Sequence, residues 1–113
     1  MILGTIDTLK ITAIATAVVN ERQLVGFDDA PAGADAVVKG VAANAAAIGD
    51  AFGLTMIGVV DLVAGAAIAA EDELVSDANG KAVPKGAGVN VFGRALTAAA
   101  NPGDSFRALV IVR

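Results

Sequence analysis

A short motif recurs along this chain and limits the folds open to it. Each copy has a glycine in a short apolar stretch, then a run rich in alanine and glycine, then an acidic residue followed by another apolar residue. The clearest copies span residues 40–52, 58–74 and 93–106, and a weaker copy spans residues 26–37. Such repetition predicts a chain built from similar strand–turn–strand units. It favours a structural protein over a scaffold with one unique reactive site.

The composition indicates one small domain with a core of small side chains. The 113 residues are 56% hydrophobic but only 4% aromatic, and 13 of them are glycine. Apolar burial contributes roughly 25 cal/mol per Å², so small side chains contribute little each, and we expect a thin core that a partner surface would extend. The alternative is a small monomer with a tightly packed Ala/Val core. We expect residues 1–22 to form an N-terminal arm and first strand, and residues 23–113 the β-rich body.

The charged and reactive residues exclude several classes of function. The chain has no cysteine and no histidine, and its formal net charge is −4. Histidine is the commonest general base and metal ligand, and nucleic-acid binding normally needs a basic patch, which is absent here. The sequence shows neither a signal peptide nor an apolar run long enough to span a membrane. We therefore expect a soluble protein made in the cytoplasm, with no cofactor and no nucleic-acid or membrane partner.

Alternation of apolar and polar residues predicts the strands. Over residues 8–19, Leu9 and Ile11 fall on one face and Lys10 and Thr12 on the other, which is typical of a half-buried strand. Further strands are predicted at residues 23–27, 36–42, 52–63, 73–76, 81–83, 89–96 and 105–112, the third of these long and central.

Two alanine-rich segments, residues 43–48 and 64–70, separate some of these strands. Alanine favours helix, but segments this short do not form stable isolated helices, so we predict a loop or a single helical turn in each. The expected fold is mainly β, a compact β-barrel or β-sandwich of short strands with hairpins.

Tight turns are predicted at two places. Asn79-Gly80 is a strong hairpin signal, because both residues tolerate the positive φ that a type I′ turn requires. Gly103 and Asp104 form a second turn, in which the aspartate accepts hydrogen bonds from nearby backbone N–H groups. Asp50 and Asp72 occupy the equivalent place in other copies of the repeat.

No motif in the chain indicates a catalytic or metal site. Residues 77–80 resemble the opening of a calcium loop, but the bidentate glutamate of that loop is missing. The carboxylates of residues 71–73 would alternate sides on a strand and cannot all bind one cation. A hydrolase that uses acidic residues alone needs two carboxylates across a cleft. The spacing of the 12 acidic residues selects no pair, and Asp50, Asp72 and Asp104, at equivalent places in the repeats, are the candidates to test. We predict no catalytic, cofactor-binding or metal-binding residues.

One part of the chain is more specific. The stretch AAIAAEDELVSDANGK at residues 66–81 is followed by GRALTAAA at residues 93–100 and by Gly103-Asp104. These residues resemble the small Ala/Gly-rich capsid decoration (cement) proteins of tailed bacteriophages. The resemblance covers roughly residues 23–113. Glu71 stands where the family usually has glycine, and the inserted Asn101-Pro102 is a second departure.

The resemblance implies a structural, non-enzymatic protein on the outer capsid surface of the virion. Its partner would be the major capsid protein, and it would form homotrimers, bind the expanded head and stabilise it against internal DNA pressure. An apolar terminus can add a strand to a neighbouring sheet edge, so the expected capsid contacts are Met1, Ile2, Leu3, Thr5 and Asp7. The alternative is that this segment is the first strand of the protein's own sheet.

A second hypothesis for the function is a small ligand- or carbohydrate-binding β-domain of a virion tail or fibre. Such a domain would expose an aromatic platform. The available aromatic residues, Phe27, Phe52, Phe92 and Phe106, all lie in apolar, strand-like stretches, and we expect them in the core.

Overall fold

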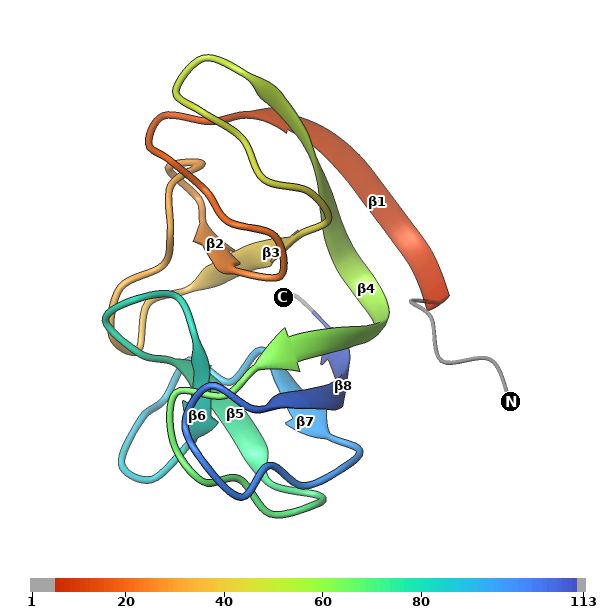
Figure 1. Cartoon of the computed structure of the whole chain (residues 1–113), viewed down its shortest axis with the longest axis vertical. Coiled ribbons are helices and arrows are strands. Elements are labelled where there is room, and N and C mark those ends of the chain that lie inside the picture. The colour runs from red at the N-terminus through yellow and green to blue at the C-terminus, as the bar shows by residue number, and fades with distance from the viewer. Residues whose placement is uncertain (1–5, 112–113) are drawn as a thin grey trace.

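The computed structural model describes residues 6–111, and all regular structure in this range is β. The strands are β1 Ile6–Ile14, β2 Leu24–Gly26, β3 Val38–Ala42, β4 Ala51–Val63, β5 Glu73–Ser76, β6 Ala82–Pro84, β7 Gly93–Ala95 and β8 Ser105–Ile111. They form one antiparallel sheet in the order β2-β3-β4-β8-β7-β5-β6, with β1 added to β4 (Figure 1). The predicted β class is confirmed.

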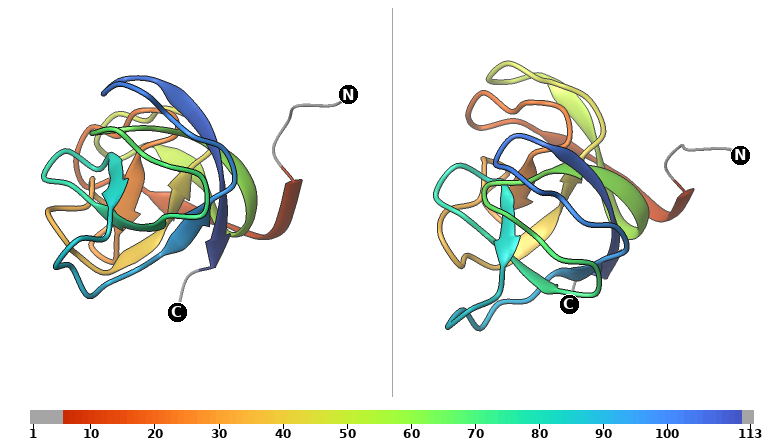
Figure 2. Two further views of the ribbon diagram at one scale, coloured as in Figure 1. Left: turned by 90° about the horizontal axis from the view of Figure 1, so that it is seen from below. Right: turned by 60° about the horizontal axis from the view of Figure 1, so that its bottom comes forward.

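The sheet curls until its two ends meet, which gives a nearly closed barrel (Figure 2). The backbone N–H of Leu24 in β2 donates a hydrogen bond of 2.8 Å to the carbonyl oxygen of Gly80 in the β5–β6 hairpin loop. The side chain of Gln23 adds a bond of 2.8 Å to the carbonyl oxygen of Asn79. None of the described residues forms a helix long and apolar enough to cross a membrane.

The long strand β4 organises the sheet, as predicted for a central strand. β1 follows one edge of β4, with Ile6 opposite Val59 and Ile14 opposite Ala51. β3 and β8 share the other edge of β4. β3 pairs with Leu54 and Thr55, and β8 pairs with residues 57–63. β1 is therefore an outer strand.

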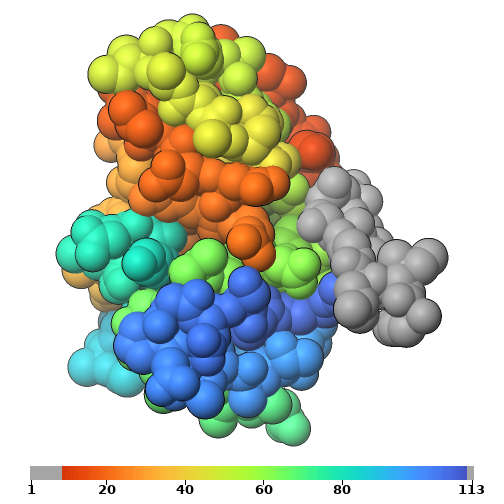
Figure 3. Space-filling view, viewed as in Figure 1, coloured from red at the N-terminus to blue at the C-terminus, as the bar shows by residue number. Residues whose placement is uncertain are grey.

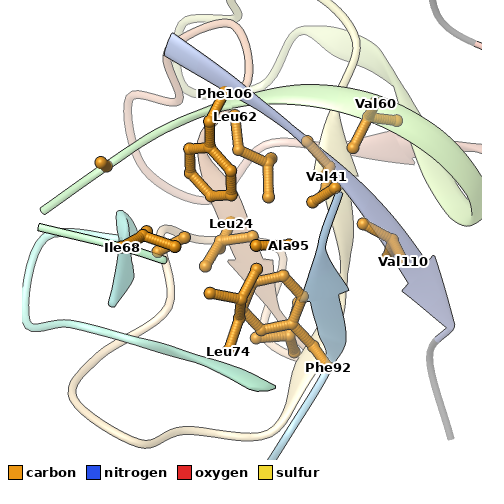
Figure 4. Packing of buried hydrophobic residues seen from close by; sticks show 14 of the residues in the cluster. Leu24, Val41, Val60, Leu62, Ile68, Leu74, Phe92, Ala95, Phe106 and Val110 are labelled. Carbon is orange, nitrogen blue, oxygen red and sulfur yellow. The ribbon is translucent and has the colours of Figure 1, made fainter. Parts of the chain in front are cut away.

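The barrel holds two groups of buried apolar side chains. The larger group, shown in Figure 4, surrounds Leu62, Leu74, Phe92 and Phe106. The smaller group lies near the start of β4 and consists of Ala13, Ala15, Val19, Val25, Ala42, Ala46, Phe52 and Leu54. Three phenylalanines are buried as expected, but Phe27 is 59% exposed.

Four equivalent units, each running strand, bend, single bridge, turn and strand, build most of the body. Their turns span residues 20–23, 47–50, 69–72 and 101–104. The third residue of each turn has positive φ: 67° at Arg22, 88° at Gly49, 74° at Glu71 and 90° at Gly103. The units associate in pairs through antiparallel bridges, Val19 with Ala46 and Ile68 with Ala99. The first pair lies in the upper half of Figure 1 and the second in the lower half, a division also visible on the surface in Figure 3.

In every unit the fourth turn residue accepts a hydrogen bond through its side chain from the backbone N–H of the first. The distances are 2.9 Å for Gln23, 3.3 Å for Asp50, 2.9 Å for Asp72 and 3.1 Å for Asp104. The fourth copy of the repeat is therefore the segment that ends at Gln23. The predicted copy at residues 26–37 was therefore wrong. The sequence did not reveal the true copy because it has Arg22 where two other units have glycine and Gln23 where the other three have aspartate.

Several local predictions need correction. The first strand ends at Ile14, well short of residue 19, because the bend of the first unit follows it. Leu9 and Ile11 are 44% and 37% exposed, so the expected apolar face is not covered. The strand predicted at residues 89–96 is only Gly93–Ala95. The alanine-rich segments form loops, the first of the two predicted alternatives, with isolated bridges at Ala46 in one and at Ala64 and Ile68 in the other.

The hairpin at Asn79-Gly80 is also not a type I′ turn. Of these two residues only Gly80 has positive φ, 72°. Its N–H donates a hydrogen bond of 3.4 Å to the carbonyl oxygen of Asp77, and the N–H of Asp77 donates one of 2.8 Å to the carbonyl oxygen of Lys81. This is a three-residue loop, in which a tight turn is followed by a glycine in the left-handed region.

Candidate functional site

The aspartates of the repeat are used locally and do not form a common site. Asp50 belongs to the first pair of units, and Asp72 and Asp104 belong to the second. Because the bridge within each pair is antiparallel, the two turns of a pair lie toward opposite ends of it. Each carboxylate accepts a backbone N–H three residues earlier, which fixes its own turn. The structure thus does not bring the three predicted hydrolase candidates together.

The hairpin that resembles a calcium loop is held by hydrogen bonds of its own. Asp77 Oδ1 accepts hydrogen bonds from the backbone N–H groups of Asn79 at 2.8 Å and Lys81 at 2.9 Å. In the acidic stretch before β5, Glu73 lies 3.8 Å from the guanidinium of Arg94. Within residues 6–111 no three acidic side chains are grouped so that they could hold a metal ion.

Asp35 is a structural residue that the sequence reasoning missed. Its carboxylate accepts hydrogen bonds from the backbone N–H groups of Val89 and Asn90, both at 3.0 Å. The side chain of Asn90 donates to the Asp35 carbonyl oxygen at 2.8 Å, and Asp35 itself has positive φ, 49°. These bonds fasten the loop after β6 to the loop before β3. Since the partners are more than 50 residues apart, no local sequence pattern could have indicated them.

Large apolar side chains on the surface are the feature most relevant to binding. Ten of the described residues are of this kind: Leu9, Ile11, Ile14, Val18, Phe27, Val37, Ile48, Val89, Leu96 and Ile111. An open groove of about 380 Å³ runs beside β7 and β8. Its lining is apolar at Val91, Phe92, Leu109 and Ile111, and it carries the charges of Glu73 and Arg94.

The predicted capsid-contact segment lies at the start of β1. Met1, Ile2, Leu3 and Thr5 fall outside the described residues. The backbone of Asp7 is part of β1, opposite Gly58 of β4. The predicted turn residues are placed in two loops: Asn79 and Gly80 between β5 and β6, and Gly103 and Asp104 before β8.

Residues 4–112 match the model of the family described as phage cement protein. The chain belongs to the phage cement protein family. The resemblance seen in the sequence is thereby confirmed and extends to the first strand. This family member is a structural decoration protein of the phage head, and its place is with the capsid in the virion.

The fold of this cement protein also occurs in a solved phage structure. The head fibre gp8.5 N base of bacteriophage phi29 superimposes with a TM-score of 0.70, covering 90% of this chain and 92% of that one at 24% identity. At this identity the likeness concerns the fold. No curated protein sequence matches the chain.

Proposed function

We propose that this cement protein binds the outer surface of the expanded head as a homotrimer and holds neighbouring major capsid proteins together. The observation that carries the proposal is the set of exposed large apolar side chains on a protein of the cement family. Apolar groups of this size at a surface are typical of protein–protein interaction sites when they lie together. The proposed role is purely mechanical, without a catalysed reaction, and the protein is made in the host cytoplasm.

The physical basis is the combination of many weak contacts. When one contact holds the protein on the shell, each further contact forms intramolecularly, so the total affinity exceeds that of any single contact. A protein that binds only the expanded shell stabilises that state by mass action. This stabilisation would oppose the internal pressure of packaged DNA.

We propose the N-terminal segment as one capsid contact, through Met1, Ile2, Leu3, Thr5 and Asp7. Its apolar start suits strand addition to a sheet edge of the shell.

A co-sedimentation experiment tests the proposal. The purified protein is mixed with undecorated expanded heads and, separately, with unexpanded shells of the same phage. We expect saturable binding at a fixed ratio to the major capsid protein with expanded heads alone. Deletion of residues 1–5 should weaken binding while the circular dichroism spectrum stays unchanged. Absence of binding to either shell form would refute the cement role for this protein.

A second function is favoured by one observation. Phe27 is 59% exposed, contrary to expectation, and a protein with this fold is the base of a head fibre. A ligand- or carbohydrate-binding β-domain would use such a ring. If Phe27→Ala abolished binding to bacterial surface glycans while head binding persisted, this function would be supported.

A further inference from the structure

β1 has a long edge that no strand covers within residues 6–111. One edge of β1 pairs with β4, and the sheet order places nothing on the other. The remaining ends of the sheet are short: β2 is tied to the hairpin loop through Leu24, and β6 has three residues ending at Pro84, which lacks an N–H. Open edges offer backbone donors and acceptors to another strand, and proteins normally protect them.

The side chains of β1 show what this edge lacks. Ile11 lies opposite Leu54, on the face of the smaller core, yet it is 37% exposed whereas Leu54 is fully buried. The difference arises because Leu54 has strands on both sides and Ile11 has a strand on one side only. Ile14, at the end of β1, is 53% exposed. A strand beside β1 would cover both isoleucines.

We infer that the partner at this edge is β1 of a second copy of the chain, related by a twofold axis at Thr12. An antiparallel edge pairs with itself in this way, and a twofold contact needs only one surface. The part of β1 with regular register runs from Lys10 to Ile14, since the irregularities lie between Asp7 and Lys10. Thr12 is the centre of this regular stretch.

The register about Thr12 places compatible side chains opposite one another and keeps the like charges apart. Thr12 faces the partner's Thr12, a favourable cross-strand pair. Ile11 faces the partner's Ala13, and Ile14 faces the aliphatic stem of the partner's Lys10. The two lysines stand about 14 Å apart along the strands, further than the screening length in physiological salt. A register centred on Lys10 would place like charges directly opposite one another.

The contact is small and therefore weak in dilute solution. Five residue pairs cover much less than the roughly 1,200 Å² of a stable interface. We expect dimers only at high concentration, or where copies are crowded on a surface. It is separate from head binding and does not depend on the proposed function.

Because the chain has no cysteine, a single engineered cysteine tests the register. In the twofold pair the Cα atoms of opposing residues lie about 5 Å apart, within disulfide range. Concentrated Thr12→Cys protein should therefore oxidise to a disulfide-linked dimer. Ile14→Cys is the matched control, exposed on the same strand and face, but its copies would be about 14 Å apart. We expect about tenfold more linked dimer for Thr12→Cys than for Ile14→Cys under mild oxidation.

A measurement without cysteine completes the test. Sedimentation equilibrium should show concentration-dependent dimers for the unmodified protein, and Thr12→Lys should abolish them by placing two ammonium groups across the axis, with an unchanged circular dichroism spectrum. Equal cross-linking of the two cysteine variants, or dimers that persist in Thr12→Lys, would overturn the inference. Since no heads are present, this result is independent of the co-sedimentation experiment.

Discussion

Replacing Glu71 by glycine should stabilise the protein, because Glu71 is an ordinary residue at a position made for glycine. Its φ is 74°, and the equivalent positions in two other units are Gly49 and Gly103 at 88° and 90°. The left-handed conformation costs a non-glycine residue about 1–2 kcal/mol. Glycine avoids this cost but loses about 0.5–1 kcal/mol through its freer unfolded chain. The expected net gain is about 0.5–1 kcal/mol in the free energy of unfolding.

The local contacts of Glu71 do not oppose this gain. Glu71 is exposed and forms hydrogen bonds through its backbone: its N–H donates to the carbonyl oxygen of Ala95 at 2.8 Å, and its carbonyl oxygen accepts from the guanidinium of Arg94 at 2.9 Å. Both bonds remain in the glycine variant. In a domain of this size the gain corresponds to a rise in melting temperature of roughly 2–5 °C.

Chemical and thermal denaturation of Glu71→Gly beside Glu71→Gln would measure the effect. The glutamine variant removes the same negative charge but keeps the strained backbone, so it separates the two causes. The reverse change, Gly103→Ala, should cost about 1 kcal/mol, since a Cβ there would meet open space and only the backbone conformation opposes it. If Glu71→Gly were no more stable than Glu71→Gln, the argument from backbone conformation would be refuted.

Three further changes test other parts of the structure. Gly93→Ala should destabilise the protein by about 2 kcal/mol or more by urea denaturation, because its Cβ would clash with the Leu109 carbonyl oxygen in the neighbouring strand; an unchanged midpoint would contradict this packing. Asp35→Ala should cost about 1–3 kcal/mol and speed tryptic cleavage after Lys85, since it releases the loop after β6; equal digestion rates would argue against that role. Asp104→Ala should cost about 1 kcal/mol and Asp104→Asn less, as asparagine keeps the accepting oxygen; equal losses in thermal melts would mean that the hydrogen bond matters little.

The sequence was informative where a residue's structure depends on its near neighbours. The β class, the long strand β4 and the position of β5 followed from alternation and from turn residues. The aspartates of the repeat were also predicted to fix their own turns. All these features involve residues a few positions apart, so local physical chemistry determines them.

Features that depend on distant parts of the chain could not be predicted. Asp35 is a capping residue only because the fold brings Val89 to it. The exposure of Ile11 depends on which strand lies beside β1. The first turn was not assigned to the repeat because Arg22 and Gln23 reproduce with other side chains the geometry that glycine and aspartate give elsewhere. Units that repeat the same backbone conformation need not repeat the same residues.

The arrangement of β1 and β8 on the two edges of β4 has a mechanical consequence. Both strands run antiparallel to β4, and the start of β1 and the end of β8 lie near the middle of β4, beside Val59 and Ile57. Tension on these two ends pulls β1 and β8 in opposite directions along β4. Such a load is a shear, which strains all the hydrogen bonds of both ladders at once instead of opening them singly. The two strand ends are thus placed so that pulling loads the sheet in shear, the geometry in which a sheet resists pulling best.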